Sequence, residues 1–253
     1  MESMNDLRLA VLIDAENIPH AAIREMLEEI AKYGTPTFKR IYADWTNPLV
    51  ARWKPVLLEH AITPVQQYSY TTGKNSTDSA MIIDAMDILY SGKVDGFCLI
   101  TSDSDFTRLA TRLREAGMKV IGMGERKTPT PFKTACDKFI YIEILKTGES
   151  HSRKLPVVKS KKGTGKQTEP ENATFTSDIV KLFYDSINDL ADDDGWAYLG
   201  DLGNLILKKQ PDFDPRNYGY SKLVSMVRKM RFLEIDERTS GQTKGRLVYV
   251  KIK

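Results

Sequence analysis

Short apolar runs alternate with longer segments of helical periodicity over the first 145 residues of the chain. The apolar runs predict buried strands at Leu9–Ile13, Phe38–Ala43, Ile62–Tyr68, Phe97–Thr101, Lys119–Met123 and Phe139–Ile142. The periodic segments predict helices at Ala21–Tyr33, Leu49–His60, Thr77–Tyr90, Phe106–Ala116 and Phe132–Ala135. Strands that alternate with helices form a parallel sheet that is covered on both faces. Residues 1–145 are therefore expected to form an α/β domain, a three-layer α/β/α sandwich.

Residues 146–174 differ in composition from the segments on either side. They are rich in Gly, Ser and Lys and have few large apolar side chains, which is typical of a flexible linker. Their net charge is +4, whereas residues 1–145 carry −2 and residues 175–253 carry +1. The sequence thus predicts a basic linker between two folded parts.

Residues 175–253 have a mostly helical pattern. Helices are expected at Ile179–Ile187, Leu199–Leu207 and Ser221–Met230, followed by strands at Phe232–Ile235 and Leu247–Ile252. Three helices followed by a hairpin predict a small C-terminal winged-helix domain.

The composition argues against secretion and against membrane insertion. No apolar run approaches the roughly 18 to 20 residues that span a bilayer, and residues 1–8 lack the apolar core of a secretory signal. The two cysteines, Cys98 and Cys136, form no CxxC pair, and the three histidines complete no zinc-type cluster. We expect a cytoplasmic protein without a membrane partner.

Three aspartates follow predicted strands closely. Asp14 closes the first strand, and Asp103 and Asp105 follow the fourth. In wound parallel sheets, ligands bind at the carboxyl ends of the strands, so these carboxylates are expected at one functional edge. Taken alone, Asp14 and Asp103 are each explained equally well as caps of the helices that follow them.

Asp78 is expected at the same edge, because it lies in the first turn of the helix after the third strand. At about 100° per residue, Ile82, Ala85 and Leu89 lie within some 40° of its direction, so Asp78 is on the face that packs on the sheet. Taken alone, it is also consistent with a first-turn carboxylate that the helix dipole favours. Asp84 points about 120° away and has poorer geometry for the same site.

Several ionised carboxylates in one cleft repel one another, by about 4 kcal/mol per pair at 4 Å and an effective dielectric near 20. Either some of them stay protonated or a cation neutralises them. All-oxygen ligands suit Mg²⁺ or Mn²⁺, which activate water and stabilise the leaving oxygen of a phosphodiester. Asn17 is most often a cap or turn residue, and it is also placed to orient a ligand water.

Two loops at this edge carry basic side chains. Lys74 lies in the turn before the Asp78 helix, where backbone N–H groups suit a phosphate. The GxxxxGK[ST] phosphate loop is not matched, so nucleotide binding is not supported. Arg126 and Lys127 follow the fifth strand and are placed to contact a phosphate backbone. Solvated turns explain both loops equally well.

The first part of the chain resembles the NYN domain, a branch of the PIN-like nucleases. The resemblance is carried by four segments in order, VLIDAENI, GKNSTDSAMIIDAMDIL, GFCLITSDSDFTRLATRLREAGMKVIGMGERKTP and FIYIE. It implies a PIN-like α/β/α fold and Mg²⁺- or Mn²⁺-dependent cleavage of RNA. By this resemblance the catalytic, metal-binding positions are Asp14, Asp78, Asp103 and Asp105, and the supporting positions are Asn17, Ser102 and Asp84.

The last part of the chain resembles the OST-HTH or LOTUS domain, most clearly over GWAYLGDLGNLILKKQPDFDPRNYGYSKLVSMVRKMRFLEI. Such domains are associated with RNA or with protein partners. On the third predicted helix, the side chains expected to contact RNA phosphates are Lys222, Arg228, Lys229 and Arg231. The alternative is a solvated helix face. Tyr218 and Tyr220 suit either stacking on unpaired bases or packing within the domain.

The leading hypothesis is a metal-dependent endoribonuclease in which a metal-activated water is the nucleophile. Asp14, Asp78 and Asp103 hold the ion, and Asp105 is a further ligand or orients the water. The alternative is a non-catalytic RNA-binding or scaffold protein. A third hypothesis is a phosphate enzyme of TOPRIM or haloacid-dehalogenase type. The latter type requires an aspartate at position 16, where this chain has Glu16, and neither type predicts an acid at position 78.

Overall fold

The computed structural model describes residues 6–68, 76–145, 175–239 and 246–253. These residues form two compact units. One comprises residues 6–145 together with residues 210–214, and the other comprises the remaining described residues from 175 onward. The predicted linker, residues 146–174, lies outside the described residues, and so does Lys74.

Six parallel strands form the sheet of the first unit, in the order β3-β2-β1-β4-β5-β6. The strands are β1 (Arg8–Asp14), β2 (Thr35–Ala43), β3 (Thr63–Gln66), β4 (Gly96–Ile100), β5 (Lys119–Gly124) and β6 (Lys138–Tyr141). Each of them coincides with one of the predicted apolar runs. The predicted parallel sheet is therefore confirmed.

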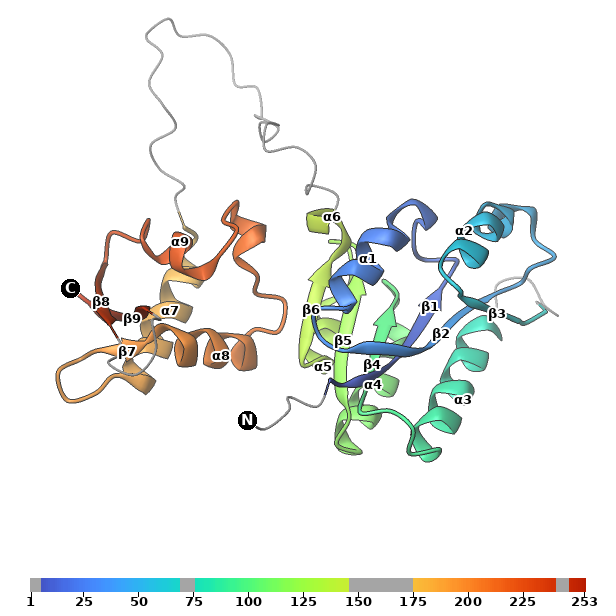
Figure 1. Ribbon diagram of the computed structural model, residues 1–253, viewed down its shortest axis with the longest axis horizontal. Helices are drawn as coiled ribbons and strands as arrows, with labels where there is room; N and C mark the ends of the chain where they lie inside the picture. The colour runs from blue at the N-terminus through green and yellow to red at the C-terminus, as the bar shows by residue number, and fades with distance from the viewer. Residues whose placement is uncertain (1–5, 69–75, 146–174, 240–245) are drawn as a thin grey trace, which may run out of the picture. The chain divides into compact units, whose positions relative to one another are not determined.

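Helices cover both faces of this sheet (Figure 1). On one face lie α1 (Ile23–Ile30), α2 (Lys54–Glu59) and α6 (Ile142–Leu145); on the other lie α3 (Ser76–Tyr90), α4 (Thr107–Glu115) and α5 (Thr130–Ala135). Side chains alternate along β1, so Val11 and Ile13 belong to the core beneath α1, whereas Leu12 belongs to the core beneath α3. These three layers are the predicted α/β/α sandwich of a PIN-like fold.

The bounds of several predicted elements of the first unit differ in the structure. The helix expected at Leu49–His60 is divided into a 3₁₀ segment, Pro48–Trp53, and α2. The 3₁₀ segment begins at Pro48 and Pro55 lies in the first turn of α2, and a proline cannot donate a backbone hydrogen bond to a preceding turn. The last strand ends at Tyr141 rather than Ile142, where α6 begins.

The second unit contains helices α7 (Ser177–Leu190), α8 (Leu199–Lys209) and α9 (Leu223–Val227). Its antiparallel sheet has the order β7-β9-β8, with β7 (Ala197–Tyr198), β8 (Leu233–Thr239) and β9 (Arg246–Ile252). This matches the predicted helices and hairpin, with the short strand β7 added. Among the described residues, no helix is long and apolar enough to cross a membrane.

The third helix of this unit is shorter than the predicted Ser221–Met230. It begins after Lys222, whose backbone is extended (φ −143°, ψ 151°). Beyond Val227 the amides of Lys229 and Met230 bond to carbonyls three residues earlier rather than four, so the chain turns instead of continuing the helix. The turn lets Met230 reach the buried interior, and the predicted helix was wrong in its length.

We predict that Leu99→Ala lowers the free energy of unfolding of the first unit by about 2–5 kcal/mol, because Leu99 is fully buried in central strand β4 and its loss leaves a cavity. Leu58→Ala is the matched control, since this leucine on α2 is 88% exposed and is expected to change stability by less than about 0.5 kcal/mol. Denaturant unfolding of both variants measures the difference. Equal losses would contradict the assigned core.

Candidate metal centre

The order of the strands places the ends of β1 and β4 side by side. From β1 the chain builds the sheet outward through β2 and β3, and from β4 it builds in the opposite direction through β5 and β6. Such a reversal opens a crevice outside the carboxyl ends of the two central strands. Asp14 is the last residue of β1, and Asp103 follows β4 within three residues.

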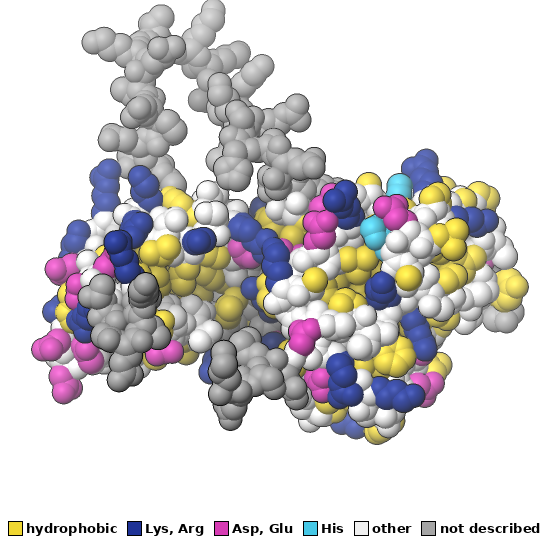
Figure 2. Space-filling view, in the orientation of Figure 1, with side chains coloured by type: hydrophobic (Ala, Val, Ile, Leu, Met, Phe, Trp, Pro, Cys, Tyr) yellow, Lys and Arg dark blue, Asp and Glu magenta, His cyan; other side chains and the backbone are white. Residues whose placement is uncertain are grey.

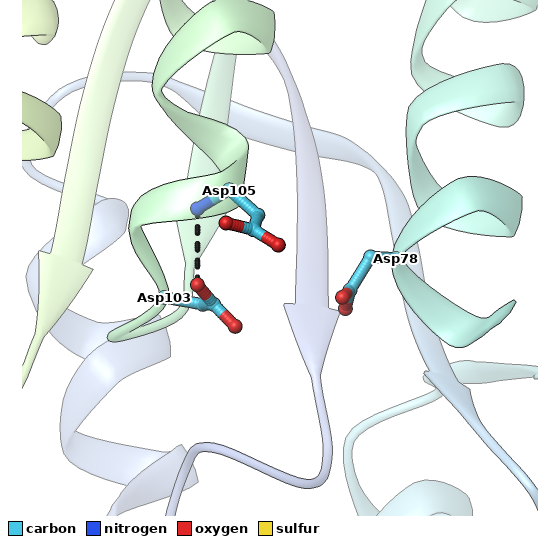
Figure 3. Close-up of side chains that lie close together, drawn as sticks. All are labelled: Asp78, Asp103 and Asp105. Atoms are coloured by element: carbon cyan, nitrogen blue, oxygen red, sulfur yellow. Dashed lines mark hydrogen bonds between the residues drawn. The ribbon is translucent and has the colours of Figure 1, made fainter. Parts of the chain in front are cut away.

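Three carboxylates converge at this edge of the sheet. One oxygen from each of Asp78, Asp103 and Asp105 lies within 4.8 Å of the other two. Figure 3 shows that Asp78 points from α3 toward the segment after β4, which carries the other two side chains. Residues from two distant parts of the chain therefore meet at one point.

The segment after β4 holds its two aspartates in a defined orientation. The backbone N–H of Asp105 donates to Oδ1 of Asp103 over 3.0 Å, so Asp103 caps a short 3₁₀ helix, Ser104–Phe106 (Figure 3). Phe106 is fully buried and anchors this turn in the core beneath α3. The cap predicted for Asp103 is thus present, and it leaves the other oxygen, Oδ2, directed toward the cluster.

Asp14 lies behind this group and is only 2% exposed. Its Oδ1 accepts a hydrogen bond from the backbone N–H of Glu16 (3.1 Å), and its Oδ2 accepts from the Asn17 amide (2.7 Å) and the Thr101 hydroxyl (2.9 Å). Burial raises the pKa of Asp14 above its ordinary value, and these hydrogen bonds oppose the rise. Asn17, which the sequence singled out, orients this carboxylate.

Thr101 connects the two central strands at the site. The buried hydroxyl donates to Asp14 at the end of β1 and accepts from the backbone N–H of Asp103 over 3.1 Å. From the sequence, Thr101 was expected only as the end of a strand and was not assigned to this site. Its signal in the sequence is a hydroxyl side chain between a buried strand and the aspartates, but only the structure shows what it contacts.

Glu16 is a further acid that the sequence analysis did not assign to this site. Its Oε1 accepts from the hydroxyl of Thr77, the residue before Asp78, over 3.4 Å. Burial raises the pKa of Glu16, and so does the charge of Asp14. The acidic region therefore extends along the first turn of α3.

The pKa of Asp78 is raised to about 6, first by burial and then by the negative charges of Asp14, Asp103, Asp105 and Glu16. Asp14 is the first of these charges, so it lies near enough to act on Asp78 although it does not belong to the three converging oxygens. In the described part of the chain, no lysine or arginine is within ion-pair distance of Asp78 or Asp103. Among the described residues, the charges of Asp78 and Asp103 are therefore not neutralised by basic side chains.

The oxygens fit a small divalent cation. Octahedral ligands about 2.1 Å from Mg²⁺ are about 3 Å apart when adjacent and about 4.2 Å apart when opposite. Separations of at most 4.8 Å need only small side-chain rotations to reach these values. The donor set is all oxygen, which suits Mg²⁺ or Mn²⁺ rather than zinc.

The other predicted residues of the first unit lie around the cluster with different partners. Ser102 accepts a hydrogen bond from the backbone N–H of Glu125 over 2.9 Å and thereby ties the loop after β5 to the site. In this loop Lys127 pairs with Glu125 at 2.6 Å, and the Arg126 guanidinium lies over the ring of Tyr141, 5.6 Å from its centroid.

Asp84 is turned away from the three converging oxygens. Its carboxylate accepts from the guanidinium of Arg40 and from the hydroxyl of Tyr42, both on β2. This agrees with the poorer geometry inferred from the helix periodicity.

In the second unit, the predicted RNA-contacting side chains divide into two kinds. Arg228 pairs with Glu237 of β8. Lys222, Lys229 and Arg231 are exposed and form no ion pair with any described residue. Figure 2 shows basic side chains on the visible face of this unit, with apolar side chains between them.

Of the two tyrosines considered for base stacking, Tyr220 stacks within the unit on Phe175, with ring centroids 6.1 Å apart.

The fold and the acidic cluster define a PIN-like nuclease domain. The chain belongs to the NYN domain family, whose model matches residues 8–143. The OST-HTH/LOTUS domain model matches residues 171–244. Both resemblances drawn from the sequence are thus confirmed. NYN domains belong to a nuclease superfamily, and OST-HTH/LOTUS domains bind RNA.

Among curated proteins, none matches the chain. Some solved structures are similar to parts of the chain. A protein of unknown function from Vibrio parahaemolyticus has 20% sequence identity and a TM-score of 0.47. The match covers 56% of this chain and 96% of that chain. An uncharacterized protein from Nitrosomonas europaea has 32% sequence identity and a TM-score of 0.29, and the match covers 38% of this chain and 90% of that chain. A protein from Chromobacterium violaceum also has 32% sequence identity, with a TM-score of 0.26, and the match covers 30% of this chain and 82% of that chain.

We predict that Asp78 titrates near pH 6 in the metal-free protein, and that Asp14→Asn lowers this pKa by removing a nearby negative charge. Carboxyl-carbon NMR titration measures both values. Because the folded pKa lies above the ordinary value of 3.8, the contribution of Asp78 to stability falls as the pH rises from about 4 through 6. A divalent ion needs the ionised form, so its affinity rises over the same range.

Asp87→Asn is the control for this titration, because Asp87 is exposed on the same helix and is not among the charges that act on Asp78. An Asp78 pKa near 4 in the unmodified protein would show that the carboxylates do not converge in solution.

Proposed function

We propose that the protein is a Mg²⁺- or Mn²⁺-dependent endoribonuclease whose C-terminal domain binds RNA. The observation that supports this most is the convergence of Asp78, Asp103 and Asp105 at the carboxyl ends of β1 and β4. Asp78 and Asp103 are half-buried and Asp105 is exposed, and carboxylates that repel one another in this way are stabilised by a divalent cation. The membership of the chain in a nuclease superfamily supports hydrolysis as the reaction.

Within this proposal each acidic residue has its own task. Asp78, Asp103 and Asp105 bind the cation, which would supply an activated water and stabilise the leaving oxygen of the phosphodiester. Asp14 is a ligand through a remaining lone pair, and it is held in place by Thr101 and Asn17. The network between Asp14 and Asp103 keeps the two central strands in a fixed relation during the reaction.

The proposed RNA contacts lie in both parts of the chain. The loop with Arg126 and Lys127 is connected to the site through Ser102, so its cations are placed to contact phosphates next to the cleaved bond. In the second unit, Lys222, Lys229 and Arg231 are the exposed cations on and around α9 that form no ion pair with a described residue. We assign residues 1–145 to the nuclease domain, 146–174 to the basic linker and 175–253 to the RNA-binding domain.

We predict that Asp103→Asn lowers the cleavage rate by more than about 100-fold at saturating Mg²⁺ or Mn²⁺, because even groups that only support metal ligands are worth 10- to 100-fold. RNA affinity measured in chelator is expected to be unchanged. Asp87→Asn is the control and keeps full activity. If the unmodified protein binds RNA but leaves single-stranded and structured RNA intact with either metal, the protein is a non-catalytic RNA-binding protein instead.

We predict that replacing Lys222, Lys229 and Arg231 together by alanine weakens RNA binding and makes it less dependent on salt. Each lost contact with a single-stranded phosphate is expected to reduce the slope of log affinity against log salt by about 0.7, and hence the three together by about 2. Lys209→Ala is the control, since Lys209 pairs with Asp189 at 2.6 Å. Fluorescence anisotropy over a salt series gives both slopes, and equal slopes would exclude this surface.

A further inference from the structure

We propose that Asp84 is a positioning residue, which holds α3 against β2 through Arg40 and Tyr42 so that Asp78 faces Asp103 and Asp105. This inference rests on the proposed metal-dependent function. It gives Asp84 a task distinct from that of the converging carboxylates, although all lie in the same unit.

Both oxygens of Asp84 are engaged by β2. Oδ1 accepts from Nη1 of Arg40, and Oδ2 accepts from the hydroxyl of Tyr42. Tyr42 is fully buried, and the side chains of Asp84 and Arg40 are 18% and 31% exposed. A charged group that touches two donors at a half-buried interface has few alternative arrangements, because losing either contact leaves a desolvated polar group unpaired.

The hydrogen bonds of Asp84 fix the rotation and the height of α3, whereas the apolar contacts of α3 do not. Met81, Ala85 and Ile88 bury the face of α3 that lies on the sheet. Apolar burial is not directional, so it tolerates small rotations of a helix. Charge-assisted hydrogen bonds depend on direction and distance, and they hold α3 at one rotation and one height along β2.

The site is sensitive to such a rotation. Asp78 precedes Asp84 by six residues, which is about 9 Å along the helix axis. A rotation of about 20° moves a carboxylate at a radius of about 5 Å by nearly 2 Å. Distances in a metal site are held to about 0.2 Å. Without a directional anchor, Asp78 would therefore miss the point where Asp103 and Asp105 meet.

Arg40 is itself held so that it keeps its charge and its direction. Its guanidinium lies over the ring of Phe38, 5.4 Å from the centroid. The hydrogen bond to Asp84 raises the pKa of Arg40. Phe38, Arg40 and Tyr42 alternate along β2 and face α3, so one face of this strand provides the whole anchor.

The test compares Asp84→Ala, Asp84→Asn and Tyr42→Phe with Asp87→Ala, an exposed acid on the same helix. Three quantities are measured in the full chain: Mn²⁺ affinity without RNA by electron paramagnetic resonance, hydrogen exchange of residues 77–80 without metal, and kcat and KM for RNA cleavage. For Asp84→Ala we expect about 10-fold weaker Mn²⁺ binding, the lower end of the range for groups that support metal ligands. Faster exchange at residues 77–80 and a lower kcat with unchanged KM are expected with it.

Asp84→Asn keeps an acceptor for one of the two donors and is expected to recover part of the loss. Tyr42→Phe removes a single hydroxyl, so it folds even where Asp84→Ala does not, and it is expected to shift all three quantities in the same direction by less. Asp87→Ala is expected to behave as the unmodified protein.

The inference is overturned if Asp84→Ala and Tyr42→Phe match Asp87→Ala in Mn²⁺ affinity and in exchange at residues 77–80. That result leaves the nuclease function intact wherever the unmodified protein binds Mn²⁺ and cleaves RNA. Failure of the proposed function can also be told apart from failure of this inference. An unmodified protein without metal binding or cleavage refutes the proposed function, while hydrogen exchange in the metal-free variants still decides whether Asp84 positions α3.

Discussion

The carboxylates at one edge of the sheet repel one another, and the rest of the first unit has to keep them in place against this repulsion. Burial and neighbouring charges raise the pKa of Asp78 to about 6, which measures how unfavourable its ionised form is there. A flexible set of acids would move apart. Here Thr101 and Asn17 hold Asp14, and the turn after β4 holds Asp103, so the charges stay together.

The order of the strands and the layers above them turns this edge into a site. Because β1 and β4 are neighbours from which the sheet grows in opposite directions, their carboxyl ends lie where sheets of this kind bind ligands. The helix α3 packs on β1 and β2, on the face of the sheet that α4 and α5 also cover, and Asp78 reaches the site from this helix. The contacts of Asp84 with Arg40 and Tyr42 of β2 join this helix to the sheet, so the proposed geometry of the cluster depends on side chains outside it.

The two units have different proposed tasks, which follow from the charges that they carry. The NYN unit carries the acidic edge, which repels an RNA backbone unless a cation is present, and its nearest basic loop partly neutralises itself through the pair Lys127–Glu125. The OST-HTH/LOTUS unit carries exposed cations without acidic partners among the described residues. Within the proposed function, RNA binding by this unit would compensate for the weak attraction of the acidic edge, since it would raise the local concentration of RNA.

The sequence by itself determined the alternation of strands and helices, the parallel sheet and the placement of Asp14, Asp78, Asp103 and Asp105 at one edge. These follow from local periodicity and from the rule that parallel strands end together. Only the tertiary structure decided that Thr101 meets Asp14, 87 residues away, that Asp84 is held by β2, and that α9 ends at Val227. Such contacts depend on which side chains face each other after the strands have paired, and periodicity along the chain carries no information about that pairing.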